Sequence, residues 1–137
     1  MKCLYFPKNL GKYRGAVPII FRSTWERKFG IYLDYHPNIE EWSFERSFIF
    51  YLDPVSNRRR RYIPDFDVKF KDGKKFLIEI KPKKETHAPR GNKRKTNKRL
   101  YYETATWKRN EAKWKAAQNF CKKFGKEFRI LTEKDLF

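Results

Sequence analysis

The stretch Pro64–Lys81, with the sequence PDFDVKFKDGKKFLIEIK, decides the fold of this chain. Apolar residues alternate with polar ones on both sides of Asp72-Gly73, a dipeptide typical of the tight turn that joins two antiparallel strands. The pattern therefore predicts a β-hairpin with strands over 64–70 and 75–81. Because strand side chains alternate between the two faces of a sheet, the pattern also assigns each residue of the hairpin to one face.

Three charged residues lie at the open end of this hairpin. Asp65 begins the first strand, whereas Glu79 and Lys81 end the second and project from the same face because they are two residues apart. Folding of the hairpin brings the carboxylates of Asp65 and Glu79 side by side, with the Lys81 ammonium next to them. Carboxylate oxygens suit a divalent metal ion, and the neighbouring cation suits a phosphate.

Two other interpretations of this pattern stay open at this point. Alternating lysine and glutamate is also the usual pattern of the solvated face of a sheet, in which case none of these residues has a chemical role. Asp67 lies two residues beyond Asp65 on the same face, and it is an alternative acid for the site.

The charge of the chain indicates which partner such a site serves. The 137 residues include 34 Lys and Arg against 16 Asp and Glu, a formal net charge of +18, which favours nucleic acid or an anionic membrane. No apolar run approaches the roughly 20 residues of a membrane-spanning helix, so we expect nucleic acid rather than a membrane. With 13 Phe, 8 Tyr and 4 Trp, the chain has the apolar content of a folded domain.

Outside the hairpin, we expect a single domain over residues 1–137. Ser23 and Glu26 form a capping-box pattern that starts a helix, and Pro37 ends it. In chain order, the remaining patterns predict an irregular segment 1–21, a helix 23–35, a strand 42–52, a basic loop 83–99, a helix 101–124 and a strand 127–131. The order α-β-β-β-α-β corresponds to an α/β (α+β) fold with a mixed central sheet flanked by helices.

Glu26 also has two interpretations. In the first, its carboxylate completes the capping box of Ser23 and is only structural. In the second, its position at the edge of the apolar arc formed by Trp25, Phe29 and Leu33 turns the carboxylate partly inward, where a metal ion or its bound water compensates the charge. We favour the second interpretation.

Clusters of basic residues predict where nucleic acid binds. Four adjacent arginines repel one another unless an anion relieves them, and the guanidinium fork matches a phosphate group. A second cluster lies in the polar stretch that follows the hairpin. The predicted contacts are Arg58, Arg59, Arg60, Arg61, Lys83, Lys84, Lys93, Arg94, Lys95, Lys98 and Arg99.

Pro64-Asp65 followed by Glu79-Ile80-Lys81 resembles the signature of the PD-(D/E)XK nuclease superfamily, complete in every motif residue. Longer stretches are more specific to one family, the head completion nucleases of large tailed phages. The stretches that resemble this family are Arg22–Glu26, Ile78–Thr86, Lys113–Gln118 and Phe128–Glu133. A more distant resemblance connects the chain to the TnsA-type transposon endonucleases.

This resemblance implies a restriction-endonuclease-like core and a metal-dependent phosphodiesterase that cuts DNA. Asp65, Glu79 and the backbone carbonyl of Ile80 would hold Mg²⁺, with Mn²⁺ as a substitute, and Glu26 matches a helix-borne glutamate of the metal shell. Lys81 would orient the attacking water or help to deprotonate it, and it would offset charge on the phosphate. The implied products carry 5′-phosphate and 3′-hydroxyl ends. One such site cuts one strand, so a double-strand break requires a homodimer or two visits.

The resemblance also implies a role in virion assembly, in which the protein acts on DNA ends together with phage head or portal proteins. We therefore expect a protein that is made in the cytoplasm of the bacterial host and then carried in the virion. Two alternatives stay open. One is a TnsA-like transposition endonuclease that works with a partner recombinase, and the other is a basic DNA-binding virion structural protein on an inert nuclease fold.

Overall fold

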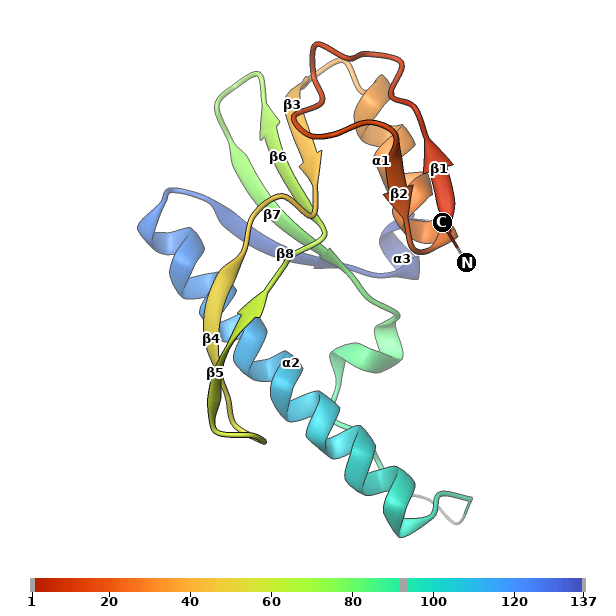
Figure 1. The fold of residues 1–137 in the computed structure, drawn as a ribbon, viewed down its shortest axis with the longest axis vertical. Coiled ribbons are helices and arrows are strands. Elements are labelled where there is room, and N and C mark those ends of the chain that lie inside the picture. Colours follow the sequence, from red (N-terminus) through yellow and green to blue (C-terminus); the bar gives the residue numbers. More distant parts are fainter. Residues whose placement is uncertain (1, 92–93, 137) are drawn as a thin grey trace.

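The computed structural model describes residues 2–91 and 94–136, and it shows an α+β fold built on one mixed sheet (Figure 1). The strands of this sheet follow the order β3 (Ile39–Phe44), β6 (Phe66–Phe70), β7 (Lys75–Ile80) and β8 (Glu127–Leu131). Neighbouring strands are antiparallel up to β7, and β8 runs parallel to β7. Two main helices, α1 (Thr24–Tyr35) and α2 (Asn97–Lys123), pack on the sheet. The predicted restriction-endonuclease-like order is thus confirmed as α1-β3-β6-β7-α2-β8.

The β6–β7 hairpin forms as the sequence predicts. Phe66 is paired with Ile78, and Gly73 in the turn has a φ of +92°, a conformation that side chains disfavour. Lys81 lies just past β7, and its N–H donates to the carbonyl of Leu131 on β8 at 3.0 Å. The open end of the hairpin, where the predicted site residues lie, is thereby attached to the neighbouring parallel strand.

The two faces of the sheet bury separate apolar cores. On one face, Leu33 of α1 packs in a cluster with Ile78 and Ile80 of β7. On the opposite face, Trp114 of α2 packs in a cluster with Leu77. Successive side chains of β7 therefore point alternately into the two cores, as the period-2 pattern of the sequence predicts.

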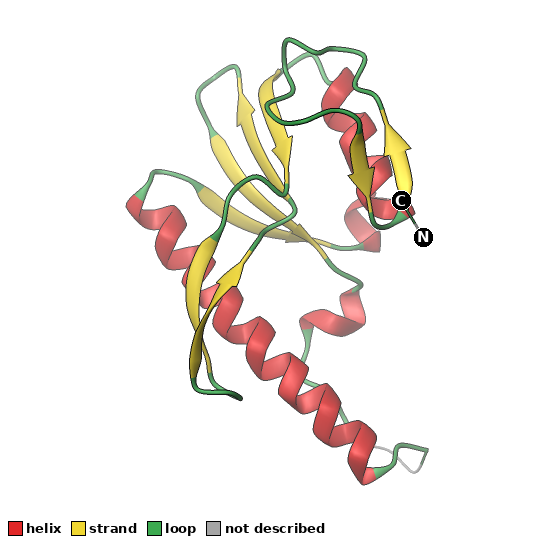
Figure 2. Ribbon diagram, viewed as in Figure 1, coloured by secondary structure: helices red, strands yellow, loops and turns green. Residues whose placement is uncertain are grey.

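The prediction of one strand over 42–52 is wrong, because this stretch forms two strands in different sheets. Glu45 follows β3 with a φ of +51°, a left-handed conformation that turns the chain out of the central sheet. Ile49–Asp53 then forms β4, which pairs with β5 (Arg58–Tyr62) as a separate hairpin that lies along α2 (Figure 2). The arginine run therefore lies on β5, outside the central sheet.

One buried carboxylate fastens this second hairpin to α2. Asp53 is fully buried at the end of β4, and it forms ion pairs with Arg60 of β5 at 3.1 Å and with Arg109 of α2 at 3.0 Å. Burial disfavours the ionised carboxyl, but the N–H groups of Val55 and Ser56 together with Arg109 outweigh burial and lower its pKa to about 2. Arg60 thus has a structural partner, whereas its contact with DNA stays a prediction.

The prediction that the segment 1–21 is irregular is wrong in part. It contains β1 (Cys3–Tyr5) and β2 (Ile19–Phe21), which pair antiparallel next to α1 (Figure 1). The fully buried carboxylate of Asp34 on α1 accepts a hydrogen bond from the Tyr5 hydroxyl at 2.5 Å and two more from backbone N–H groups of the following loop. Tyr5 and Asp34 are 29 residues apart, so no local pattern in the sequence indicates that they form a contact. The two strands were missed for this reason.

The predicted basic loop 83–99 is shorter than expected. Its first residues form a 3₁₀ helix, η1 (Lys83–Thr86), and α2 begins directly after Thr96. The Thr96 hydroxyl caps α2 by accepting a hydrogen bond from the backbone N–H three residues later, at 3.1 Å. The last two cations of the predicted loop therefore lie on α2, and Lys93 lies outside the described residues.

The C-terminal elements agree with the prediction. Helix α2 ends before Gly125, whose φ of +67° is a left-handed conformation suited to glycine. Strand β8 follows over the predicted residues, and a short helix, α3 (Glu133–Leu136), comes after it. Within residues 2–91 and 94–136, no helix is long and apolar enough to cross a membrane.

Candidate active site

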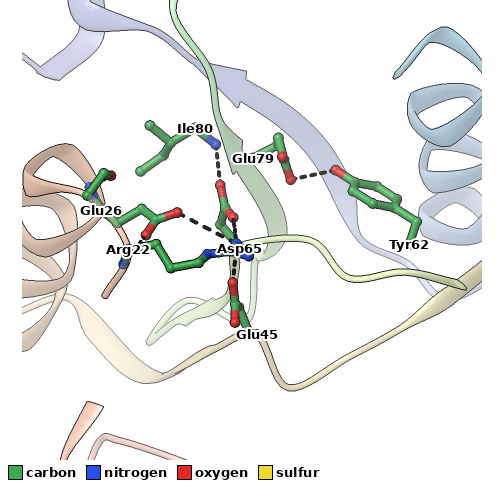
Figure 3. Close-up of polar contacts among 8 residues, drawn as sticks. Arg22, Glu26, Glu45, Tyr62, Asp65, Glu79 and Ile80 are labelled. Carbon is green, nitrogen blue, oxygen red and sulfur yellow. Dashed lines mark hydrogen bonds and ion pairs between the residues drawn. The ribbon is translucent and has the colours of Figure 1, made fainter. Parts of the chain in front are cut away.

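Asp65 lies at a bend directly before β6, and backbone groups hold it there. Its carbonyl accepts a hydrogen bond from the N–H of Glu45 at 2.8 Å, and its carboxylate accepts one from the N–H of Ile80 at 2.7 Å. Only 3% of the residue is exposed. The hairpin therefore brings Asp65 to the end of β7, as predicted, with its carboxylate against the β7 backbone (Figure 3).

Glu79 lies on β7, one residue before Ile80, whose N–H binds Asp65. It lies on the α2 side of the sheet, because its neighbours Ile78 and Ile80 belong to the core on the α1 side. Its carboxylate accepts a hydrogen bond from the Tyr62 hydroxyl at 2.6 Å, and only 7% of the residue is exposed. Since Tyr62 ends β5, the β4–β5 hairpin positions a site residue of the central sheet.

Glu26 reaches the same region from the first turn of α1. Its N–H donates to the Ser23 hydroxyl at 3.1 Å, which caps the helix. Its carboxylate accepts a hydrogen bond from the N–H of Arg22 at 2.8 Å, so only half of the predicted capping box forms. The residue is 8% exposed, in agreement with the inward orientation that its helix position predicts.

The Arg22 side chain lies between three carboxylates, as Figure 3 shows. Its Nη2 is 3.6 Å from an Asp65 oxygen and 3.8 Å from a Glu26 oxygen, and it forms an ion pair with Glu45. The side chain is 62% exposed, so it extends from solvent to the buried acids. Arg22 thus supplies positive charge where acids from three segments of the chain meet.

Burial raises the pKa of three acids in this region, Asp65, Glu79 and Glu45. It is the main cause that raises the pKa of Asp65 to about 8, and the charge of Glu79 adds to the effect. Burial also raises the pKa of Glu79, against the hydrogen bond from Tyr62 and the charge of Lys81. The pKa of Glu45 is raised as well, by burial, although Arg22 opposes the rise. A further cation placed among these carboxylates would favour their ionised forms.

Two lysines lie close to Glu79. Lys81 is half-buried just past the end of β7, and Lys113 comes from α2. The charge of each lowers the pKa of Glu79 and so partly offsets burial. Burial, followed by the charge of Lys81, lowers the pKa of Lys113. Lys81 therefore lies beside Glu79 as predicted, and Lys113 is a second cation of the site.

The donor chemistry of the cluster fits Mg²⁺, which binds carboxylate and carbonyl oxygens. In the described part of the chain, however, no three His, Cys, Asp or Glu side chains are placed so that they could hold an ion. Instead, the carboxylates of Asp65 and Glu79 accept hydrogen bonds from Ile80 and Tyr62, and Arg22 lies between the other acids. The metal ligands that we predicted, with Glu26 and the Ile80 carbonyl among them, stay predictions.

Asp67, the alternative acid, has partners of its own. Its carboxylate accepts a hydrogen bond from the Ser47 hydroxyl at 2.7 Å and forms an ion pair with Lys126 at 3.1 Å. The Asp67 carboxylate is therefore bound by groups that do not belong to the cluster around Asp65. The structure therefore favours Asp65 as the acid of the site.

The arginines of β5 divide between two faces of the β4–β5 hairpin. The guanidinium carbon of Arg59 lies 3.8 Å from the ring centre of Phe50, and that of Arg61 lies 4.8 Å from the ring centre of Phe48. These cation–π contacts hold two exposed guanidinium groups in place on the face opposite to Asp53.

The second basic cluster is partly neutralised. Lys95 and Arg99 form ion pairs with Glu103 at 2.6 and 2.9 Å. Lys83 and Lys84, in contrast, are exposed on η1, three and four residues after β7 ends. The contacts of all these cations with DNA stay predictions.

Four residues of this site lie outside the predicted set: Arg22, Glu45, Tyr62 and Lys113. Each belongs to a segment other than the β6–β7 hairpin, and their contacts with Asp65 and Glu79 join separate segments of the chain. Glu45 had a weak signal, since a charged residue between two apolar runs marks a break between strands. Tyr62 had none, because its strand pairs with β4 and not with the central sheet.

Comparison with known proteins identifies relatives over most of the chain. Residues 36–133 match the family described as TnsA-like endonuclease N terminal. The chain is 44% identical over 136 residues to a protein named head completion nuclease, from Enterobacteria phage T4. That alignment covers 96% of this chain and 91% of the phage protein. The family match includes Asp65, Glu79 and Lys81, whereas Glu26 lies before it.

Proposed function

Because the chain belongs to the family of TnsA-like endonuclease N-terminal domains, we propose that it is a metal-dependent DNA endonuclease of the PD-(D/E)XK type. The observation that carries the proposal is the joint burial of Asp65 and Glu79 at one end of the sheet, with Glu26 buried on α1 next to Arg22. Uncompensated burial of carboxylates is unfavourable, and it raises the pKa of both sheet acids. A divalent ion bound by these oxygens supplies the missing compensation.

Each residue of the site has a part in this proposal. Glu26, Asp65, Glu79 and the Ile80 carbonyl would hold Mg²⁺ or Mn²⁺, which when bound neutralises the scissile phosphate and lowers the pKa of water. Lys81, beside Glu79, orients the attacking water or accepts its proton, and it offsets the charge that develops on the phosphate.

Neighbouring residues position these groups. The Tyr62 hydroxyl holds the Glu79 carboxylate at 2.6 Å, and the Ile80 N–H holds that of Asp65 at 2.7 Å. Lys113 brings a second positive charge to the side of the sheet where Glu79 lies, which suits a bound phosphate. Arg22, which reaches solvent, exchanges its carboxylate partners for a phosphate of the DNA backbone.

Cleavage by the purified chain tests this proposal. Linear, circular and branched DNA are incubated with Mg²⁺, with Mn²⁺ and with EDTA, and the product ends are mapped. We expect cleavage with either ion, none with EDTA, and 5′-phosphate ends. Cleavage that continues in EDTA would contradict the metal dependence. Failure to cut any of these DNA forms would instead favour the inert structural protein.

The name of the phage relative supports a role in virion assembly, in which this protein acts on the DNA end at a filled head and contacts head or portal proteins. The family match supports the alternative of a transposition endonuclease, which requires a partner recombinase. Mass spectrometry of purified virions separates the two roles. Presence in virions with cleavage by the isolated chain supports head completion, whereas absence with strict dependence on a recombinase supports the alternative.

DNA binding in EDTA is expected to depend steeply on salt, because counterions are released at each neutralised phosphate. The logarithm of affinity should fall linearly with the logarithm of salt concentration, by about 0.9 per phosphate contacted. The double variant Arg59→Ala with Arg61→Ala should make this slope shallower by about 2 and weaken all sequences equally. Fluorescence anisotropy with a labelled duplex measures the slope.

The matched control removes two exposed cations from the other end of the β6–β7 hairpin. Lys71→Ala with Lys74→Ala carries the same loss of charge, but both residues lie by the turn and away from the site. An equal change of slope in both double variants would show that binding follows net charge alone, and it would remove β5 from the proposed DNA path.

A further inference from the structure

A cavity of about 770 Å³ lies between α2 and the segment that follows β7. One wall includes Lys84 of η1 and Arg90 in the next loop, and the other includes Tyr102, Trp107 and Asn110 of α2. Figure 1 shows η1 on the path from the end of β7 to the start of α2. The volume is within the range of pockets that bind small organic molecules, about 300 to 1,000 Å³.

Two residues that line this cavity lie near residues of the candidate active site in the sequence. Lys84 follows Lys81 by three residues, so one end of the cavity begins just after the catalytic strand. Asn110 lies one helical turn before Lys113, whose charge acts on Glu79. A group bound at the Asn110 end of the cavity therefore lies about one helical turn along α2 from Lys113.

The α2 wall presents aromatic rings. Trp107 is half-buried and packs edge-on against Trp114, with 5.9 Å between the ring centres, which fixes its orientation. Tyr102 is 59% exposed and packs edge-on against Tyr101 at 5.7 Å. Rings that line a cavity in this way form a surface on which a planar base stacks.

Asn110 adds a polar group to the same wall. It is only 6% exposed, and it lines the cavity together with Trp107. The amide of an asparagine supplies two N–H donors and a carbonyl acceptor, so it can bind a polar group in the cavity. The edge of a nucleobase offers donors and acceptors of the kind that satisfy such an amide.

The rim of the cavity is basic. Four cations line it against two acids: Lys84 and Arg90 lie there with Glu85, and Lys95 and Arg99 form ion pairs with Glu103. Positive groups around an aromatic wall match the phosphate and the base of one nucleotide. The bases of a duplex, in contrast, are stacked and paired, so their faces and pairing edges are not free to enter a cavity.

We propose that this cavity binds an unpaired nucleotide of the DNA substrate. Its base stacks on Tyr102 and Trp107 against Asn110, and its phosphate lies at Lys84 and Arg90. The inference rests on the proposed function, because the nucleotide belongs to the strand that the neighbouring site would cut. It defines the substrate class as DNA with a single-stranded end or gap next to the cut.

Binding experiments in EDTA test this inference without cleavage. Fluorescein-labelled duplexes with blunt ends, with a 3′ overhang and with a 5′ overhang are titrated with the full chain at fixed salt. We expect one of the overhang duplexes to bind at least about 10-fold more tightly than the blunt duplex. Tyr102→Ala should weaken overhang binding by about 5- to 100-fold, the range for loss of one stacked base, and leave blunt binding unchanged.

Tyr101→Ala is the matched control, because Tyr101 is the adjacent exposed tyrosine and does not line the cavity. Asn110→Ala, with its fold checked by circular dichroism, should also lose overhang preference. Equal binding of blunt and overhang duplexes, or equal losses in Tyr101→Ala and Tyr102→Ala, would overturn the inference. Since no cleavage is measured, these results do not depend on the nuclease assay, whose failure would refute the proposed function separately.

Discussion

Asp65→Asn should lower metal-dependent DNA cleavage by at least about 10³-fold while the chain stays folded and binds DNA. Asparagine keeps the size of the side chain but removes the negative charge that a metal ion requires. Asp65 is nearly fully buried and accepts the Ile80 N–H, so the amide oxygen of asparagine retains that hydrogen bond. Single-turnover cleavage with Mg²⁺ and DNA binding in EDTA measure the two effects separately.

The same substitution should not lower stability at neutral pH in EDTA. Burial and the charge of Glu79 raise the pKa of Asp65 to about 8 in the folded chain. The stabilisation from protonated Asp65 is therefore full below its ordinary pKa of 3.8 and is lost as pH rises through about 8. Asparagine is neutral at every pH, so the melting temperature of Asp65→Asn should match or exceed that of the parent at pH 8.

Asp67→Asn provides the matched control for this prediction. The residue has the same type and lies two positions later, but its carboxylate is engaged by Ser47 and Lys126. We expect Asp67→Asn to retain nearly full cleavage. Loss of activity in Asp67→Asn with full activity in Asp65→Asn would transfer the metal site to Asp67.

Glu26→Gln should lower cleavage by about 10²-fold or more, with a melting temperature within about 3 °C of the parent. Glutamine keeps the chain length and an oxygen that accepts the Arg22 N–H, whereas the negative charge is lost. A partial recovery at high Mn²⁺ concentration is expected if Glu26 helps to hold the ion. Cleavage rates over a range of Mn²⁺ concentrations, together with thermal unfolding, make the measurement.

Ser23→Ala is the complementary variant, because it removes the cap of α1 and leaves the Glu26 carboxylate in place. The Ser23 hydroxyl accepts the N–H of Glu26 at 3.1 Å, and loss of such a cap costs about 1 kcal/mol of stability. Cleavage at a temperature well below unfolding should not change. If Glu26→Gln cleaves at the parental rate, Glu26 has only a structural role in the first turn of α1.

Local patterns were sufficient for much of this protein. The alternation on both sides of Asp72-Gly73 predicted the β6–β7 hairpin, and the Ser23 cap predicted where α1 begins. The same hairpin predicted that Asp65 lies against the end of β7, next to Glu79. All of these contacts lie within one element or between neighbouring strands, so the period of the side chains and the turn residues determine them.

The tertiary structure alone decided how the site is completed. The ion pairs of Arg22 with Glu45 and Asp65, the hydrogen bond from Tyr62 to Glu79 and the link of Asp53 to Arg109 join separate elements of the chain. Tertiary packing also divides 42–52 into two strands, because β4 lies outside the central sheet and packs on α2. Such contacts depend on how whole elements pack against one another, and the periodicity of one segment contains no information about its distant partner.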